Sequence, residues 1–273
     1  MSSSGSCMKK KTPLRVVQLS DFHLFADPSA TLLGLSTQSS FESVLELVRL
    51  EQPQMDVLLA TGDLSQDASA ASYARAVKAL EAFNTPVYWL EGNHDKPAPL
   101  LQALEGKLHR LSPCVATHGN WTFILLDSTI PGDVPGELFQ DDLTFLAQAL
   151  ADHKEQHVMV CLHHHPVPIG CRWLDEQRVN NAEAFFQVID QHTNVRAIVW
   201  GHVHQEFAGQ RRGVELYAVP STCIQFKPHC ERFTVDTLSP GYRWFDLYPD
   251  GRIVTEVSRV EEVFHVDFAS NGY

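Results

Sequence analysis

Residues 87–95 read VYWLEGNHD, in which four apolar residues precede a glutamate, a glycine and three polar side chains. The run 87–90 is short, continuous and rich in aromatic residues, which predicts a strand buried within a sheet. Gly92-Asn93-His94-Asp95 follows where that strand ends. In α/β folds, ligand sites form at this carboxyl edge of the sheet. The segment therefore predicts both a buried strand and a position for chemistry.

Further strands are predicted on both sides of this segment, at 14–19, 56–61, 121–126, 158–162 and 195–200. Helix patterns, with apolar residues at i, i+3, i+4 and i+7, separate these strands. The first predicted helix follows Ser39 and ends before Pro53. The other predicted helices cover residues 70–83, 142–150 and 182–191. Ser39 and Glu42 match a capping box. The alternation predicts an α/β fold built on buried, largely parallel sheet.

The tail, about 213–260, has short apolar runs with turns at Pro240-Gly241 and at 249–251, which predicts antiparallel strands. No linker or internal repeat interrupts the chain, so we expect a single domain over 14–273. Residues 1–13 contain basic residues without a following apolar stretch of signal-peptide length. We expect them to be a disordered leader.

The composition excludes several kinds of partner. A formal net charge of −12 argues against nucleic acid, because binding it relies on Lys and Arg that neutralise phosphates. No segment approaches the roughly 18 apolar residues of a membrane span, so we expect no membrane partner. The six cysteines form no CxxC pair, which favours reduced thiols in a cytoplasmic protein.

Five polar clusters lie just past the ends of predicted strands. They are Asp21-Phe22-His23, Gly62-Asp63, Gly92-Asn93-His94-Asp95, His163-His164-His165 and Gly201-His202-Val203-His204. Each cluster alone is typical of a turn, a helix cap or a hydrogen-bonded histidine. Their conjunction, in order and at strand ends, predicts one site. Carboxylate, amide and imidazole ligands together favour Mn, Fe, Zn or Co over Ca, and no cysteine falls in the set, which argues against a thiolate zinc site.

The ordered set resembles the calcineurin-like metallophosphoesterase superfamily. More narrowly, the segments LSDFHLF, ATGDLSQD, WLEGNHD, CLHHHPVPIGCRWLD and PSTCIQFKPHC resemble the bacterial class III cyclic-nucleotide phosphodiesterases, from about Leu14 to the C-terminus. The resemblance implies a four-layer αββα sandwich, in which two mixed sheets are flanked by helices.

The resemblance also implies a role for each position. One metal would be held by Asp21, His23, Asp63 and His204, and a second by Asp63, Asn93, His163 and His202, so that Asp63 bridges them. His94 would be a catalytic group rather than a ligand, acting as proton donor or charge stabiliser, with Asp63 as its catalytic partner. Substrate contacts would come from His23, Asp63, Asn93, His94, His163 and His204. His164 and His165 would lie behind the ligands or face the substrate.

The implied activity is two-metal hydrolysis of 3′,5′-cyclic AMP to 5′-AMP by a metal-bridging hydroxide, which lowers cyclic-nucleotide signalling. The cofactors would be two divalent ions, with Fe²⁺ or Mn²⁺ favoured and Mg²⁺, Co²⁺ or Zn²⁺ also suitable. The alternatives are a metallophosphoesterase for another small ester (a 2′,3′-cyclic nucleotide, a glycerophosphodiester or a phosphomonoester) and, more remotely, a non-catalytic scaffold. The sequence does not distinguish the native metal pair, cyclic AMP from cyclic GMP, or a monomer from a homodimer.

Three neighbouring features keep two interpretations each. Arg172-Trp173 either stacks on a base or forms a surface turn over the core. Asp95 either orients His94 or caps the next helix. The segment with Cys223, Gln225, Phe226 and His229 mixes polar and aromatic residues, and the resemblance favours a loop that closes over the metals.

Overall fold

Two six-stranded sheets form the centre of the molecule in the computed structural model, which describes residues 12–106 and 110–272. The first has the order β14 (Ile253–Arg259), β13 (Gly241–Leu247), β1 (Leu14–Leu19), β4 (Val57–Thr61), β5 (Val87–Leu90), β6 (Arg110–Leu111). The second has the order β11 (Phe207–Arg211), β12 (Val214–Ala218), β10 (Val195–Trp200), β9 (His157–Cys161), β8 (Trp121–Leu125), β7 (Cys114–His118). The predicted leader lies outside the described residues except for Thr12 and Pro13.

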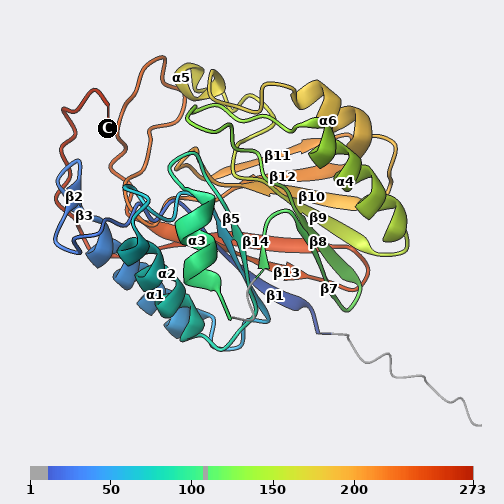
Figure 1. Cartoon of the computed structure of the whole chain (residues 1–273), viewed down its shortest axis with the longest axis horizontal. Coiled ribbons are helices and arrows are strands. Elements are labelled where there is room, and N and C mark those ends of the chain that lie inside the picture. The colour runs from blue at the N-terminus through green and yellow to red at the C-terminus, as the bar shows by residue number, and fades with distance from the viewer. Residues whose placement is uncertain (1–11, 107–109, 273) are drawn as a thin grey trace, which may run out of the picture.

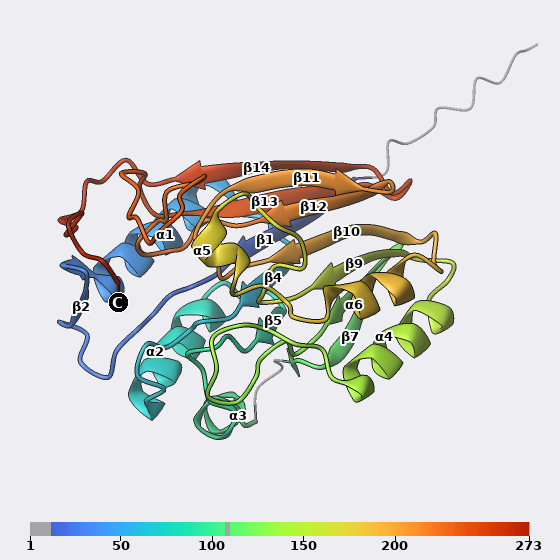
Figure 2. The same cartoon turned by 90° about the horizontal axis from the view of Figure 1, so that it is seen from above.

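Both sheets are mixed, as expected. Strands β1, β4, β5 and β6 run parallel in the first sheet, and β12, β10, β9 and β8 run parallel in the second. Antiparallel strands are added at the edges: β13 and β14 in the first sheet, and β11 and β7 in the second. Figure 2 shows the strands β11 to β14 gathered at one side of the molecule.

The helices cover the outer faces of the two sheets. On the first sheet lie α1 (Thr37–Glu51), α2 (Ala70–Glu81) and α3 (Pro97–Leu104); on the second lie α4 (Gln140–Asp152) and α6 (Ala182–Ile189). Figure 1 shows the first group at lower left and the second at upper right. The short α5 (Arg172–Asp175) and the hairpin of β2 (Thr31–Leu32) with β3 (Leu35–Ser36) complete the elements. None of the described helices is both long and apolar enough to cross a membrane.

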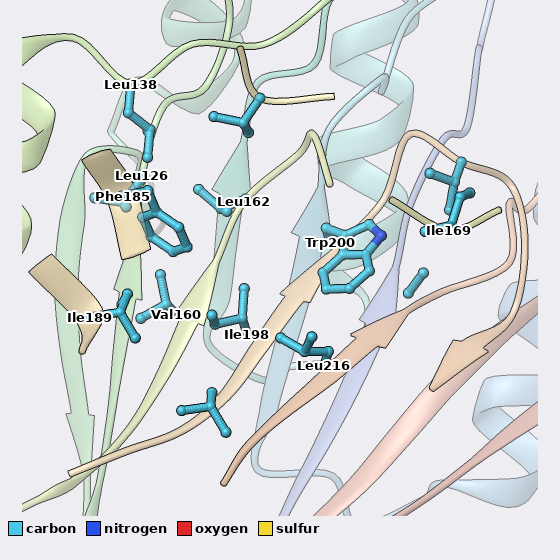
Figure 3. Close-up of a cluster of buried hydrophobic side chains, with 14 of the residues drawn as sticks. Leu126, Leu138, Val160, Leu162, Ile169, Phe185, Ile189, Ile198, Trp200 and Leu216 are labelled. Atoms are coloured by element: carbon cyan, nitrogen blue, oxygen red, sulfur yellow. The ribbon is translucent and has the colours of Figure 1, made fainter. Parts of the chain in front are cut away.

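Alternating side chains produce the four layers. In β1, Val17 and Leu19 pack under α1 and α2, whereas Val16 packs against the other sheet. In β10, Ile198 and Trp200 face the helices of the second sheet, whereas Val199 faces the first sheet. Because successive strand residues point to opposite faces, an all-apolar strand is buried on both sides. The αββα sandwich is thereby confirmed, and Figure 3 shows part of its second outer layer, where Phe185 packs beside Val160 and Leu162.

The structure corrects some predicted boundaries. Helix α1 begins at Thr37, because the Ser36 side chain accepts from the backbone N–H of Ser39; Ser39 is therefore inside the helix and is not its cap. The antiparallel prediction for the tail holds for β13 with β14, and β12 pairs in parallel with β10 as well as antiparallel with β11. Between β12 and β13, residues 219–240 form a long loop with one isolated bridge, from Phe226 to Val235.

Candidate active site

The five polar clusters meet at one edge, beyond the carboxyl ends of β1, β4, β5, β9 and β10. Two backbone hydrogen bonds join the first two clusters, from Asp21 N to Gly62 O and from His23 N to Asp63 O, each 2.9 Å. Five residues of the clusters adopt a left-handed backbone conformation, with φ between 46° and 63°: Asp21, His23, Asp63, His202 and His204. Such conformations are strained for residues other than glycine, and they concentrate at functional sites.

Glycine precedes three of the clusters because the loops approach each other closely. A Cβ atom on Gly62 would lie 2.3 Å from Nδ1 of His163, and one on Gly92 would lie 2.3 Å from Oδ1 of Asp63. A Cβ atom on Gly201 would lie 2.0 Å from the Ser20 hydroxyl oxygen. The glycines of the three motifs are therefore needed to bring the polar side chains together.

Three buried imidazoles present the same nitrogen to the site. Nδ1 of His23 contacts Gln66 Oε1 at 2.6 Å, Nδ1 of His163 contacts Thr61 O at 2.8 Å, and Nδ1 of His204 contacts Ile224 O at 2.9 Å. Each partner is an oxygen that only accepts, so each Nδ1 carries the proton and donates it. In the neutral ring Nε2 is then a lone-pair donor, which is the usual arrangement for a metal-binding histidine.

Contacts link all seven predicted ligands into one set, in which Asn93 is half-buried and the other six are buried. His204 Nε2 lies 3.5 Å from Asp21 Oδ1 and 3.1 Å from His23 Nε2. Asp63 Oδ2 lies 3.7 Å from His23 Nε2 and 3.5 Å from His163 Nε2, so it is placed between the two halves of the set. His163 in turn contacts Asn93 Oδ1 at 3.3 Å and has its ring centroid 5.2 Å from that of His202.

This donor set fits metal cations. Two Nε2 lone pairs 3.1 Å apart repel each other unless a positive charge lies near both, and Nε2 of His202 has no hydrogen-bond partner among the described residues. Burial lowers the pKa of His23 to about 3, so its ring is neutral. Burial also lowers the pKa of His163, but the Asp63 carboxylate outweighs it and raises that pKa to about 9. The environment of Asp63 therefore stabilises a positive charge, which a bound cation would supply.

His94 lies beside this set. Its backbone N–H donates to Asp63 Oδ1 at 2.9 Å, and its ring meets His23 edge-on with centroids 4.9 Å apart. The side chain is half-buried, whereas the histidines among the predicted ligands are buried. The position fits a group that faces a substrate, as the sequence predicts.

The other two histidines of the fourth cluster, His164 and His165, lie behind the set. His164 uses both ring nitrogens, Nδ1 with the Ser128 hydroxyl at 2.9 Å and Nε2 with Val134 O at 3.0 Å. His165 stacks on His202 with centroids 5.9 Å apart, and its Nε2 lies 3.7 Å from Asp175 Oδ1. Both side chains thus support the loops around the predicted ligands.

Asp95 has a role that neither interpretation described. Its carboxylate accepts from the backbone N–H groups of Gly92, Leu64 and Ser65, at 2.9 to 3.1 Å. Helix α3 begins after Lys96, with no side-chain cap. Asp95 is therefore not a cap, and it ties the Gly-Asn-His-Asp loop to the Gly-Asp loop.

The long loop 219–240 reaches the site, as the sequence predicts. Phe226 stacks on His204 with centroids 4.2 Å apart, and the Cys223 sulfur lies within 4.8 Å of the ring nitrogens of His23 and His204. Cys223 thus lies beside the predicted ligands, in the segment that the resemblance places over the metals. Burial raises the pKa of Cys223 to about 12, so it is a neutral thiol. Trp173 packs on Phe226 at 5.0 Å, which favours the interpretation that it covers the core.

Two residues near the site were missed in the sequence. Gln66 fixes the His23 ring, but its partner is 43 residues away, so spacing gives no signal. Glu91 is 6% exposed and lines a cavity of ≈ 610 Å³ beside Asn93 and His94. Burial, with Asp127 and Asp95 adding to it, raises the pKa of Glu91 to about 8. A buried acid next to the Gly-Asn-His-Asp motif was the available signal.

Comparisons with known proteins agree with this geometry. A protein from Pseudomonas aeruginosa named 3′,5′-cyclic adenosine monophosphate phosphodiesterase CpdA is 47% identical over 259 residues, which cover 94% of each chain. The protein of the same name from Escherichia coli K12 is 41% identical over 261 residues, 95% of each chain. A dimetal phosphatase from Danio rerio shares the fold, with a TM-score of 0.67 at 17% identity over 94% of this chain and all of that one. The family model for calcineurin-like phosphoesterases matches residues 14–206, the part that carries every predicted ligand, and the chain belongs to that family.

Proposed function

We propose that this chain hydrolyses 3′,5′-cyclic AMP to 5′-AMP with two divalent metal ions. The observation that carries the proposal is the largely buried set of imidazole, carboxylate and amide donors, in which three Nε2 atoms have been oriented by hydrogen bonds at Nδ1. The substrate comes from the similar proteins, whose names state this activity and whose similarity spans nearly the whole of both chains.

The donors divide into two groups around Asp63. We assign Asp21, His23, Asp63 and His204 to one ion, and Asp63, Asn93, His163 and His202 to the other. Fe²⁺ and Mn²⁺ are the proposed ions, because imidazole, carboxylate and amide ligands suit both. When bound, a metal pair neutralises charge on a phosphate and lowers the pKa of water.

The chain's own residues then position and protonate the substrate. The phosphate is proposed to lie against His23, Asp63, Asn93, His94, His163 and His204. A water oxygen adds to phosphorus as the bond from phosphorus to the 3′ oxygen breaks, and the His94 ring N–H donates its proton to that leaving oxygen. The attacking water gives up a proton to solvent, and His94 takes a proton back from solvent before the next turnover. The backbone N–H of His94 holds Asp63 Oδ1, so the position of the proton donor is coupled to that of the shared carboxylate.

A substrate panel tests the proposal. Protein stripped with a chelator is supplied with Mn²⁺ or Fe²⁺ and assayed with 3′,5′-cyclic AMP, 2′,3′-cyclic AMP and p-nitrophenyl phosphate. We expect no turnover before metal is added, and the highest kcat/KM for 3′,5′-cyclic AMP afterwards. A higher kcat/KM for the phosphomonoester would overturn the substrate assignment, and full activity in the stripped protein would overturn the metal assignment.

A further inference from the structure

A cavity opens beside the proposed metal ligands, and most of its wall has no role in the hydrolytic chemistry described above. It has a volume of ≈ 610 Å³, within the usual range for small-molecule sites. Asn93 and His94 line it at the side of the metal cluster. The rest of its wall comes from the start of α3, the loop 127–132 after β8, and the start of α4. A substrate whose phosphate lies at His94 would therefore place its other end here.

The walls of the cavity suit a flat apolar ring. Pro97 and Pro99 line it from the α3 side, and Ile130, Pro131 and Phe139 line it from the other. Phe139 is 48% exposed, which leaves much of its large apolar side chain uncovered. Aromatic and apolar faces of this kind stack on nucleobases without regard to the base. The walls thus explain binding of a base, and the polar groups must supply any choice between bases.

Among the acids that line the cavity, Glu91 is the one whose carboxyl group accepts no hydrogen bond from the described residues. The other three acids are engaged in holding loops: Asp95 accepts from the N–H groups of Gly92, Leu64 and Ser65, Asp127 accepts from the N–H and hydroxyl of Thr129, and Asp142 accepts from the N–H of Phe139. Glu91 is more than nine-tenths buried and makes no hydrogen bond to any residue in 12–106 or 110–272. A ligand that fills the cavity displaces water from this carboxyl group, so a ligand that brings a hydrogen-bond donor is favoured over one that does not.

We propose that this cavity receives the adenine base of the substrate and that Glu91 accepts a hydrogen bond from its exocyclic 6-amino group. A carboxyl oxygen accepts from an amine whether or not the other oxygen carries a proton. A base that lacks the amine leaves Glu91 unpaired inside the protein, which is the most effective way for a site to reject a near-identical ligand. The inference rests on the proposed function and adds to it a residue that selects the base.

The test compares three substrates in the metal-loaded full-length protein. Cyclic AMP offers the amine, the 3′,5′-cyclic monophosphate of purine riboside lacks only that amine, and bis(p-nitrophenyl) phosphate has no base. For the wild type we expect kcat/KM to favour cyclic AMP over the purine riboside analogue by roughly tenfold to a hundredfold, the effect of one hydrogen bond to a carboxylate. The difference should reside mainly in KM, because the base is remote from the bond that breaks.

Substitution of Glu91 should remove this preference. In Glu91→Ala the kcat/KM for cyclic AMP should be about equal to the kcat/KM for the purine riboside analogue. The ratio of kcat/KM for cyclic AMP to that for the base-free diester should fall by the same factor as the wild-type preference. Glu91→Gln keeps an oxygen acceptor and should restore the preference. Asp133→Ala is the matched control: it removes an exposed acid from the neighbouring loop, outside the cavity wall, and should keep the wild-type ratios.

The outcomes separate this inference from the proposed function. If the wild type hydrolyses cyclic AMP and the purine riboside analogue equally well, Glu91 does not read the amine and the inference is wrong while the function stands. If Glu91→Ala lowers the rates for all three substrates in parallel, Glu91 supports the Asn93 loop or a cation and the inference is again overturned. If the wild type with metal hydrolyses no cyclic nucleotide, the proposed function itself fails.

Discussion

Removal of the hydrogen bond between Gln66 and His23 should weaken metal binding at one of the two proposed positions. Gln66→Leu keeps the size of the side chain and removes the oxygen that lies 2.6 Å from His23 Nδ1. Nδ1 then has no fixed acceptor, so the ring loses both its orientation and its preference for the tautomer with a free Nε2. Loss of such a partner typically lowers metal affinity by about 10-fold to 100-fold, or about 1.4–2.7 kcal/mol.

The structure predicts that only one of two binding steps changes. His23 belongs to the group with Asp21 and His204, whereas the other group relies on the contact from His163 to Thr61 O. Titration of stripped protein with Mn²⁺ in the presence of a competing chelator should therefore show one Kd raised by about 10-fold to 100-fold. The second Kd should stay within about threefold of the wild-type value, because its orienting bonds are intact.

Two further variants control this experiment. Gln66→Glu retains an oxygen acceptor and should bind both ions nearly as the wild type does. Gln148→Leu makes the same change on the exposed face of α4, far from the cluster, and should alter neither Kd. Equal weakening of both steps in Gln66→Leu, or no weakening of either, would refute the separate assignment of His23.

Three other predictions concern the site, the proton donor and the core. Asn93→Ala should weaken one metal step and remove most hydrolysis while the thermal unfolding midpoint stays near that of the metal-free wild type; unchanged turnover would contradict the assignment of Asn93. His94→Ala should lower kcat by about 100-fold to 10,000-fold, the usual worth of a general acid, with metal content by elemental analysis nearly intact; loss of metal instead would make His94 a ligand. Phe185→Ala should destabilise the fold by about 3–5 kcal/mol in urea unfolding, because the fully buried ring leaves a cavity under α6; a change below about 1 kcal/mol would mean that the layer repacks freely.

The layers could be predicted from sequence where burial is complete. Strand β4 has four apolar residues followed by Thr61 and is buried at every residue, and its short apolar run predicts a buried strand. The edge strand β11, FAGQR, alternates between exposed and half-buried residues and carries no apolar run, so nothing in its sequence predicts it. This strand forms because it pairs with β12, and its own sequence does not predict that pairing.

The start of α1 shows the same limit. Ser36 and Ser39 are both good capping residues, and only Ser39 is followed by an acid at the right spacing. The hairpin of β2 and β3 holds Ser36 in an extended conformation, which decides the cap. A local pattern cannot express that constraint.

The candidate ligands were easier to predict than the residues that contact them or line the neighbouring cavity. Asp21, Asp63 and His163 were candidates because each follows a predicted strand, and the ends of these strands, β1 and β4 in the first sheet and β9 in the second, lie close together in the structure. Gln66 could not be found, because its partner is a ring 43 residues away. Glu91 had one signal, its place between an apolar strand and Gly92, but the cavity that it lines is enclosed by separate segments that the sequence does not bring together.

Product formation as a function of metal added tests the central claim most directly. Stripped protein is titrated with Mn²⁺ at saturating 3′,5′-cyclic AMP, and the nucleotide product is identified by chromatography. The structure and its proposed chemistry predict that 5′-AMP is the sole product and that its rate of formation reaches a plateau at two ions per chain. A plateau at one ion per chain, or 3′-AMP as the product, would contradict a two-metal site that cleaves the bond to the 3′ oxygen.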